Sequence, residues 1–150
     1  MDAINLRKAK SSKDSNFAYS VKKAAFREYV EKVWGWDEAA QRRLHKKRFK
    51  AQKFYIISWN GEDVGIISFA NKHDCVKVYQ LFILPESQNK GIGSKCMQLI
   101  LEEAQRMGLP IRLQVLKNNP RALAFYQRLG FARIDETETH NLMELEPTAH

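Results

Sequence analysis

The sequence predicts an α/β protein built on a mixed central sheet of six to seven strands, with helices on both faces. Three observations lead to this fold class. Segments with helical spacing of apolar residues alternate with short β-rich runs along the chain, and glycine, proline or asparagine stands at most of the changes. The 150 residues, 44% hydrophobic and 28% charged, suit one globular domain covering residues 1–150. The resulting element order, β-α-α-β-β-β-α-β-α-β-β, is typical of a sheet covered on both faces.

The first third of the chain predicts one strand and two helices. Residues 4–7 form the short strand. Over residues 15–34 apolar side chains recur at helical spacing, and Gly35 is expected to end this helix. Asp37 is expected to cap a second helix that runs to residue 49. The apolar stripe of the first helix consists of Phe17, Val21, Ala25, Phe26, Val30 and Val33.

The middle of the chain predicts three consecutive strands. Residues 54–59 are rich in aromatic and β-branched side chains, and Asn60-Gly61 follows them directly. Asn-Gly is the strongest short signal for a hairpin turn. Residues 64–70 therefore return as the second strand, and residues 76–84 form a third, longer one.

The next segment, Gly91-Ile92-Gly93, opens a long predicted helix that ends at Gly108. Glu102 and Arg106 are expected to form an ion pair one turn apart on its exposed side. The face expected to be buried consists of Ile92, Cys96, Leu99, Ile100, Ala104 and Met107.

The last elements are a strand, a short helix and two closing strands. Residues 111–116 form the strand. Asn119-Pro120 begins the helix, since proline at the first helical position loses no hydrogen bond, and Gly130 ends it. Residues 131–134 and 142–145 are the closing strands.

The charge of the protein is uneven. The net charge is +8, and residues 1–53 alone hold fifteen Lys and Arg against six Asp and Glu. Residues 42–50 are the densest basic run. A basic face attracts nucleic acid, acidic membranes or anionic substrates. We favour a solvated helix face, because no other nucleic-acid signal accompanies the run.

Several functional classes do not fit. No apolar stretch approaches the roughly 18 residues that span a bilayer, and the N-terminus has no apolar signal core. Cys75 and Cys96 are too few to staple a secreted scaffold, so we expect a cytoplasmic protein. No His/Cys/Asp cluster has metal-ligand spacing, and no metal is expected.

The segment 88–93 lies between a strand and a helix and carries the first chemical signal. Glycines there let a ligand approach the backbone, and the first N–H groups of the helix favour an anion. A Walker A loop would need Lys-Ser/Thr after the second glycine. A dinucleotide fingerprint would need a third glycine where Cys96 stands. A coenzyme A diphosphate loop and a plain structural turn remain as alternatives.

Two motifs together decide between them. The block 84–93 reads Leu-Pro-x-x-Gln-x-x-Gly-x-Gly, and the block 119–131 reads Asn-Pro-Arg-Ala-x-x-Phe-Tyr-x-x-Leu-Gly-Phe. In this combination the chain resembles the GCN5-related N-acetyltransferase (GNAT) superfamily over nearly its whole length. The resemblance implies the GNAT fold and direct transfer of an acetyl group from acetyl-CoA, used as co-substrate, to a primary amine.

The resemblance also implies roles for individual residues. The pantetheine arm would lie along the third long strand, the diphosphate on the glycine loop, and Asn119 and Tyr126 near the arm. The implied cofactor residues are Phe82, Ile83, Leu84, Gln88, Asn89, Lys90, Gly91, Ile92, Gly93, Ser94, Asn119 and Tyr126.

Tyr126 lies where the family has the acid that protonates the departing thiolate, and it is our first catalytic candidate. The resemblance does not identify a general base in this sequence. Gln114 stands where some members have a glutamate, and residues 77–80 hold no carboxylate. His140 on the closing hairpin titrates in a suitable range and is the second catalytic candidate, with Glu136 and Glu138 as further choices.

The acceptor pocket would be walled by the first two helices and their connection. Trp34 and Trp36, followed by two acids, predict an aromatic, anionic lip for an amine, whereas the basic helix behind them favours an acidic acceptor. The acceptor therefore stays open, with a small amine or amino-acid-like molecule slightly favoured. The predicted substrate residues are Tyr29, Trp34, Trp36, Tyr79 and Gln80.

Competing functions remain open at this point. A non-catalytic acyl-CoA sensor or interaction protein would retain the coenzyme pocket without a base. A protein N-terminal or lysine acetyltransferase would share the machinery and differ in acceptor. The expected partners are a small-molecule or peptide amine and, as an assembly, a homodimer, whereas nucleic acid and membranes are not expected.

Overall fold

The computed structural model describes residues 3–147, so residues 1–2 and 148–150 of the predicted domain lie outside the described part. Seven strands form one sheet in the order β1-β2-β3-β4-β5-β7-β6, and only the β4–β5 pair is parallel. The strands are β1 Ile4–Lys8, β2 Phe54–Trp59, β3 Glu62–Asn71, β4 Val76–Ile83, β5 Ile111–Leu116, β6 Ala132–Glu136 and β7 His140–Leu145.

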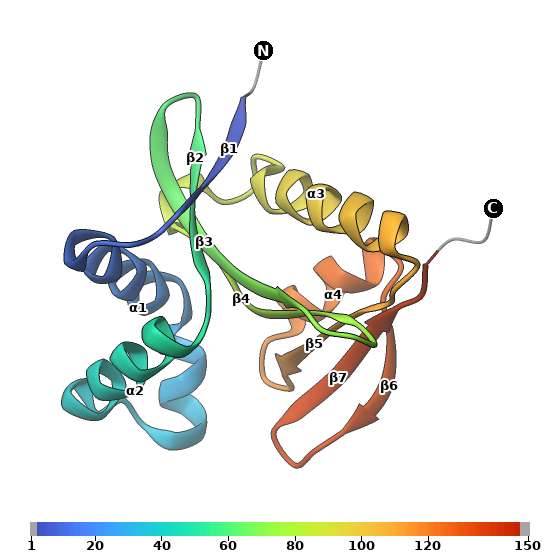
Figure 1. The fold of residues 1–150 in the computed structure, drawn as a ribbon. Coiled ribbons are helices and arrows are strands. Elements are labelled where there is room, and N and C mark those ends of the chain that lie inside the picture. The colour runs from blue at the N-terminus through green and yellow to red at the C-terminus, as the bar shows by residue number, and fades with distance from the viewer. Residues whose placement is uncertain (1–2, 148–150) are drawn as a thin grey trace.

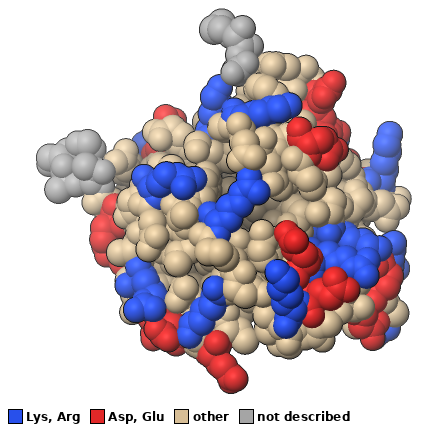
Figure 2. Space-filling view, turned by 180° about the vertical axis from the view of Figure 1, so that it is seen from behind, with Lys and Arg blue, Asp and Glu red and all other residues tan. Residues whose placement is uncertain are grey.

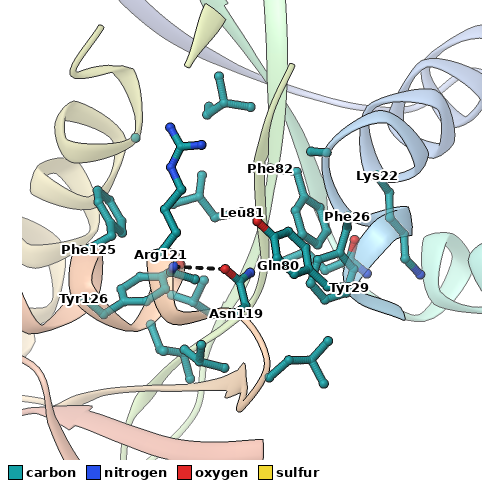
Figure 3. Close-up of a pocket in the computed structure, with 18 of the residues that line it drawn as sticks. Lys22, Phe26, Tyr29, Gln80, Leu81, Phe82, Asn119, Arg121, Phe125 and Tyr126 are labelled. Carbon is teal, nitrogen blue, oxygen red and sulfur yellow. Dashed lines mark hydrogen bonds between the residues drawn. The ribbon is translucent and has the colours of Figure 1, made fainter. Parts of the chain in front are cut away.

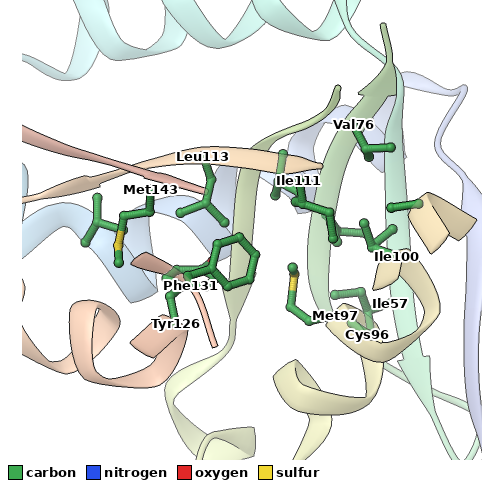
Figure 4. Packing of buried hydrophobic residues seen from close by; sticks show 14 of the residues in the cluster. Ile57, Val76, Cys96, Met97, Ile100, Ile111, Leu113, Tyr126, Phe131 and Met143 are labelled. Atoms are coloured by element: carbon green, nitrogen blue, oxygen red, sulfur yellow. The ribbon is translucent and has the colours of Figure 1, made fainter. Parts of the chain in front are cut away.

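Helices cover both faces of this sheet (Figure 1). The helices are α1 Ser12–Trp34, α2 Glu38–Ala51, α3 Ile92–Met107 and α4 Pro120–Arg128. α1 packs on one face, where Ala18 and Val21 contact Ile56 and Ile66. The larger core lies between the other face and helices α3 and α4; Figure 4 shows Met97 and Tyr126 within it. The predicted fold class and element order are therefore confirmed.

The helix boundaries follow the predicted caps closely. α1 begins three residues earlier than predicted, because the Ser11 side chain accepts a hydrogen bond from the Asp14 N–H. Gly35 ends this helix at a φ of 78°, which favours glycine. The Asp37 carboxylate caps α2 by accepting from the Ala40 N–H at 3.0 Å.

The exposed side of α3 differs from the prediction. Leu99 and Met107 are 43% and 42% exposed, whereas Met97 is fully buried. A helix can turn only one side to the sheet, and Met97 lies on that side. Arg106 pairs with Glu103, not with Glu102, because the residue three positions away also lies on the same surface.

The predicted hairpin turn between β2 and β3 is present. Asn60 and Gly61 have φ angles of 52° and 86°, as the β2–β3 hairpin requires. Cys75 and Cys96 are both buried and unpaired with each other. Within residues 3–147, none of the helices is long and apolar enough for a membrane crossing.

Candidate functional site

The site begins where β4 and β5 separate. The two parallel strands pair only at Val76–Ile111 and Lys77–Arg112. Beyond that point β5 remains paired with β7, while β4 remains paired with β3 through Ile83. The facing edges of β4 and β5 therefore have no strand partner in this stretch, and a gap opens toward the carboxyl end of β4.

A bulge sharpens the divergence of β4. Ser68 of β3 opposes Gln80, and Phe69 opposes Val78, so Tyr79 is an extra residue on β4. Further along, the Ile83 carbonyl accepts a hydrogen bond from Gln88 Nε2 at 2.9 Å, on the side away from β3. In an antiparallel ladder the N–H of the same residue points the same way. Ile83 therefore presents its N–H to the gap.

The loop after β4 brings a helix N-terminus to the end of this gap. Asn89 and Gly91 have φ angles of 64° and 79°, and the second value favours glycine. Gly91 is the N-cap of the 16-residue helix α3 and provides no side-chain cap. The first N–H groups of α3, from Ile92 to Ser94, have no partner within the helix. Their position at the helix N-terminus favours the binding of an anion.

Two contacts hold this loop in place. Gln88 ties it to β4 through Ile83, as described above. Arg121 at the start of α4 donates to Asn89 Oδ1 at 2.6 Å, which links α4 to the loop (Figure 3 shows the position of Arg121). The exposed guanidinium of Arg121 adds a positive charge beside the N–H groups of α3.

A cavity of about 1060 Å³ joins the gap, the loop and the space beneath α1 and α2. Leu84, Lys90, Trp36 and the alternative bases Glu136 and Glu138 do not line it, whereas the structure brings together all the other predicted site residues. These are Tyr29, Trp34, Tyr79, Gln80, Phe82, Ile83, Gln88, Asn89, Gly91, Ile92, Gly93, Ser94, Asn119, Tyr126 and His140. The lining is thus shared by predicted coenzyme, acceptor and catalytic residues.

Tyr126 lies on the α4 side of the cavity, with its ring in the core. The ring packs edge to face with Phe125 and Phe131, at centroid distances of 4.9 and 5.5 Å. Within residues 3–147, its hydroxyl has no hydrogen-bond partner. Burial raises the pKa of Tyr126 above its ordinary value of 10, so the hydroxyl keeps its proton at neutral pH.

Asn119 combines a structural contact with a free donor. Its Oδ1 accepts from the Ala122 N–H at 3.1 Å and caps α4, as Figure 3 shows. In the described part of the chain its Nδ2 makes no hydrogen bond, and Asn119 lines the cavity. The predicted cap is therefore present, and a coenzyme contact is compatible with it.

Comparison with known proteins agrees with this geometry. Residues 18–131 match the model of the acetyltransferase (GNAT) family. The chain belongs to this family. Among curated relatives, it is 31% identical over 86 residues to an uncharacterized N-acetyltransferase of Methanocaldococcus jannaschii. That match covers 52% of this chain and 38% of the relative, so the chain spans much less than the whole of that protein.

Solved structures show the GNAT fold over the full chain. The PaiA N-acetyltransferase of Thermoplasma acidophilum, crystallised with coenzyme A, has a TM-score of 0.76 and 18% identity, covering 96% of this chain and 99% of that one. The ribosomal-protein-S18-alanine N-acetyltransferase of Escherichia coli has a TM-score of 0.71 and 18% identity, covering 100% and 97%. At this identity the likeness concerns the fold alone.

Few side chains that line the cavity could act as a general base for the acceptor amine. Gln114 of β5 and Gln80 of β4 line it, and neither accepts a proton. Glu136 and Glu138 do not line it, and Glu136 is paired with Lys117 at 2.8 Å. His140 does line it, with Nδ1 2.8 Å from Thr139 Oγ1, and burial lowers its pKa, so the ring is neutral at pH 7.

The predicted aromatic lip is only partly present. Trp34, 59% exposed, lies against His140 at a centroid distance of 6.2 Å and lines the cavity. Trp36 instead donates its Nε1–H to Glu38 at 3.0 Å. Hydrogen bonds from Lys23, Trp36 and Tyr19 lower the pKa of Glu38 to about 2. Because Glu38 is compensated within the protein, it does not make the rim anionic.

The cavity also contains residues that sequence reasoning missed. Lys22 of α1 and Arg48 of α2 line its far end, Phe26 of α1 lies against Phe82 of β4, and Arg121 lines the loop end. Arg121 falls inside the second family motif, so its position was available as a signal. Lys22 and Arg48 lie on two helices whose relative placement no local pattern reveals.

Proposed function

We propose that this protein is an N-acetyltransferase that transfers the acetyl group of acetyl-CoA directly to a primary amine. The observation that carries the proposal is the single cavity that joins the β4–β5 gap, the open N-terminus of α3 and Tyr126. The gap suits the extended pantetheine arm, and the α3 N–H groups suit the diphosphate. Both groups are recognised through backbone atoms.

The chemistry follows from the position of these groups. The amine nitrogen attacks the thioester carbon, a carbon–nitrogen bond forms, and the carbon–sulfur bond breaks. The Ile83 N–H is oriented to stabilise charge on the carbonyl oxygen. Tyr126, held protonated by burial, donates its proton to the departing thiolate. The amine loses its proton to water or to His140, and solvent returns a proton to Tyr126.

A small amine fits this site better than a protein N-terminus. The acceptor end of the cavity reaches Lys22, which is only 4% exposed, so the occupant must enter deeply between α1 and α2. The E. coli enzyme compared above acts on a ribosomal-protein alanine by its name. A peptide with a free N-terminus is therefore the alternative acceptor to include in the test.

The test is acetyl transfer from acetyl-CoA to a panel of amines and short peptides, followed by thiol release and by the mass of the product. We expect an added acetyl group on at least one amine. Binding of acetyl-CoA without transfer to any acceptor would favour the sensor function, which the glutamines at positions 80 and 114 support. Failure to bind acetyl-CoA would contradict both.

A further inference from the structure

The end of the cavity between α1 and α2 contains two cations. Lys22 of α1 is 4% exposed, and Arg48 of α2 is half-buried; both line the cavity. In Figure 3 the Lys22 side chain extends from α1 away from the β4 strand. The other lysines of the basic run on α2, such as Lys46 and Lys47, are exposed to water and do not line the cavity.

Neither cation has an acidic partner within residues 3–147. Lys22 Nζ lies 3.5 Å from Gln41 Oε1, which is at the outer limit of a hydrogen bond. The carboxylate that α2 itself contributes is that of Glu38, and Lys23 and Arg42 already bind it at 2.7 and 2.8 Å. Two positive charges thus share one end of the cavity without compensation.

This arrangement is unfavourable for the protein alone. Burial, and then the charge of Arg48, lower the pKa of Lys22 to about 8, and burial also lowers the pKa of Arg48. Burial lowers the pKa of the neighbouring His45 as well, with Lys22, Arg48 and Arg42 acting in the same direction. An unpaired charge in a buried position destabilises a protein. An anion bound at this end of the cavity would compensate the two cations.

The nearby wall of the cavity offers a hydrogen-bond acceptor in place of a positive charge. Gln80 of β4 is 8% exposed, and among the described residues its buried Oε1 has no hydrogen-bond partner. An N–H donor in the cavity would satisfy it. Gln80 lies on the strand that borders the β4–β5 gap, whereas Lys22 and Arg48 lie at the α1–α2 end. The lining therefore suits a molecule with an amine at one end and a negative group at the other.

We propose that the acceptor amine also carries an oxyanion, a carboxylate or a phosphate, which Lys22 and Arg48 bind at the α1–α2 end of the cavity. This inference rests on the proposed function, because it names the class of acceptor for that transfer. Arg48 can bind the two oxygens of either group with two parallel hydrogen bonds, while Lys22 supplies a point charge.

The first experiment measures kcat/KM for matched acceptors. A series of ω-amino acids from glycine to aminohexanoate is compared with the corresponding primary amides, and aminoethyl phosphate is included to separate phosphate from carboxylate. We expect one anionic acceptor to exceed its neutral counterpart by roughly 10- to 100-fold, the usual strength of charge-assisted hydrogen bonds. Equal rates for every acid and its amide would overturn the proposal.

Variants assign the preference to these side chains. Lys22→Met keeps the length of the side chain and removes its charge, and Arg48→Gln is the second variant in case the first does not fold. Each is expected to reduce the acid-to-amide ratio by roughly tenfold or more. Lys47→Met, on the exposed surface of the same helix, is the control and should leave the ratio unchanged. A ratio unchanged in both test variants would contradict the assignment.

A binding measurement separates this inference from the proposed function. Butanoate and inorganic phosphate have no amine and are not acetylated. Calorimetry should show that at least one of them binds the wild type and that Lys22→Met weakens this binding. Binding without any acetyl transfer would support the anion site and contradict the transferase. Acetyl transfer to amides and acids alike, with no anion binding, would support the transferase and contradict the anion site.

Discussion

The two ends of the cavity, which we propose bind the coenzyme and the acceptor and call the coenzyme end and the acceptor end, are built in different ways. At the coenzyme end the groups offered to a ligand are backbone atoms of β4 and of the first turn of α3, and Gly91 and Gly93 leave them accessible. At the acceptor end the groups are side chains, above all Lys22, Arg48 and Gln80. Backbone recognition suits a ligand that the whole family shares, whereas side chains are free to vary with the acceptor.

The difference also appears in the charges of the two ends. The α3 N-terminus attracts an anion through N–H groups, with Arg121 beside it, and needs no buried charge. The acceptor end instead buries Lys22, which has no carboxylate partner in the part of the chain that the structure describes. The first end contains no buried side-chain cation, whereas at the second end the proposed anion would compensate the buried charge of Lys22.

Loss of the Tyr126 hydroxyl should have the largest effect. Tyr126→Phe keeps the ring that packs against Phe125 and Phe131, so the melting temperature should not change. If the hydroxyl protonates the thiolate, kcat should fall by about 10²–10⁴, the usual contribution of a placed general acid. Acetyl-CoA affinity, measured by calorimetry, should change little. Full turnover in this variant would make Tyr126 a packing residue.

The pH profile should show the next largest effect. With glutamines at positions 80 and 114, no carboxylate of β4 or β5 takes the proton of the amine there, and we expect the amine to lose it to water. For butylamine, which carries no anion, kcat/KM should therefore rise about tenfold per pH unit from pH 7 to 9, since amine pKa values lie near 10.4. The raised pKa of Tyr126 keeps it protonated over this range. A plateau from about pH 6.5 that disappears in His140→Ala would instead identify His140 as the base.

The backbone cradle should be sensitive to a branched side chain. A Cβ at Gly93 would meet only the Phe125 ring, at 3.4 Å, so the protein itself should tolerate a small addition. Gly93→Val places methyl groups where the diphosphate approaches the α3 N–H groups. We expect acetyl-CoA binding to weaken by about 1–3 kcal/mol in calorimetry. Gly93→Ala is the milder control, and unchanged affinity in a folded Gly93→Val would contradict the loop assignment.

The two helix caps give the smallest effects and the sharpest comparison. Asp37 caps α2 behind the acceptor end, and Asn119 caps α4 beside the coenzyme end. Replacement of either by alanine should reduce the free energy of unfolding by about 1 kcal/mol in urea titrations. Only Asn119→Ala should also weaken acetyl-CoA binding, because only Asn119 lines the cavity. Equal affinities in both variants would restrict Asn119 to its structural role.

Much of the coenzyme end was predictable from the chain. Gly91, Asn119 and Tyr126 lie in two short motifs, and each motif coincides with a strand–helix junction that local rules identify. The caps at Asp37 and Asn119 and the Asn60-Gly61 turn also followed from local hydrogen bonding and from backbone conformation.

The acceptor end was less predictable. Trp36 was expected at its rim, but its indole binds Glu38, because the α1–α2 connection turns this side chain back onto the helices. Lys22 lies outside the apolar stripe that the sequence predicts for α1. It is buried because α2 folds across its side of the helix.

The sequence by itself determined the order of helices and strands, the caps and turns, and the glycine loop, because each depends on residues within one or two turns of one another. Tertiary structure alone decided which side chains share the cavity. The separation of β4 from β5 depends on β5 pairing with β7, and the juxtaposition of Lys22 with Arg48 depends on how α1 meets α2. Both are contacts between distant segments, which no local pattern specifies.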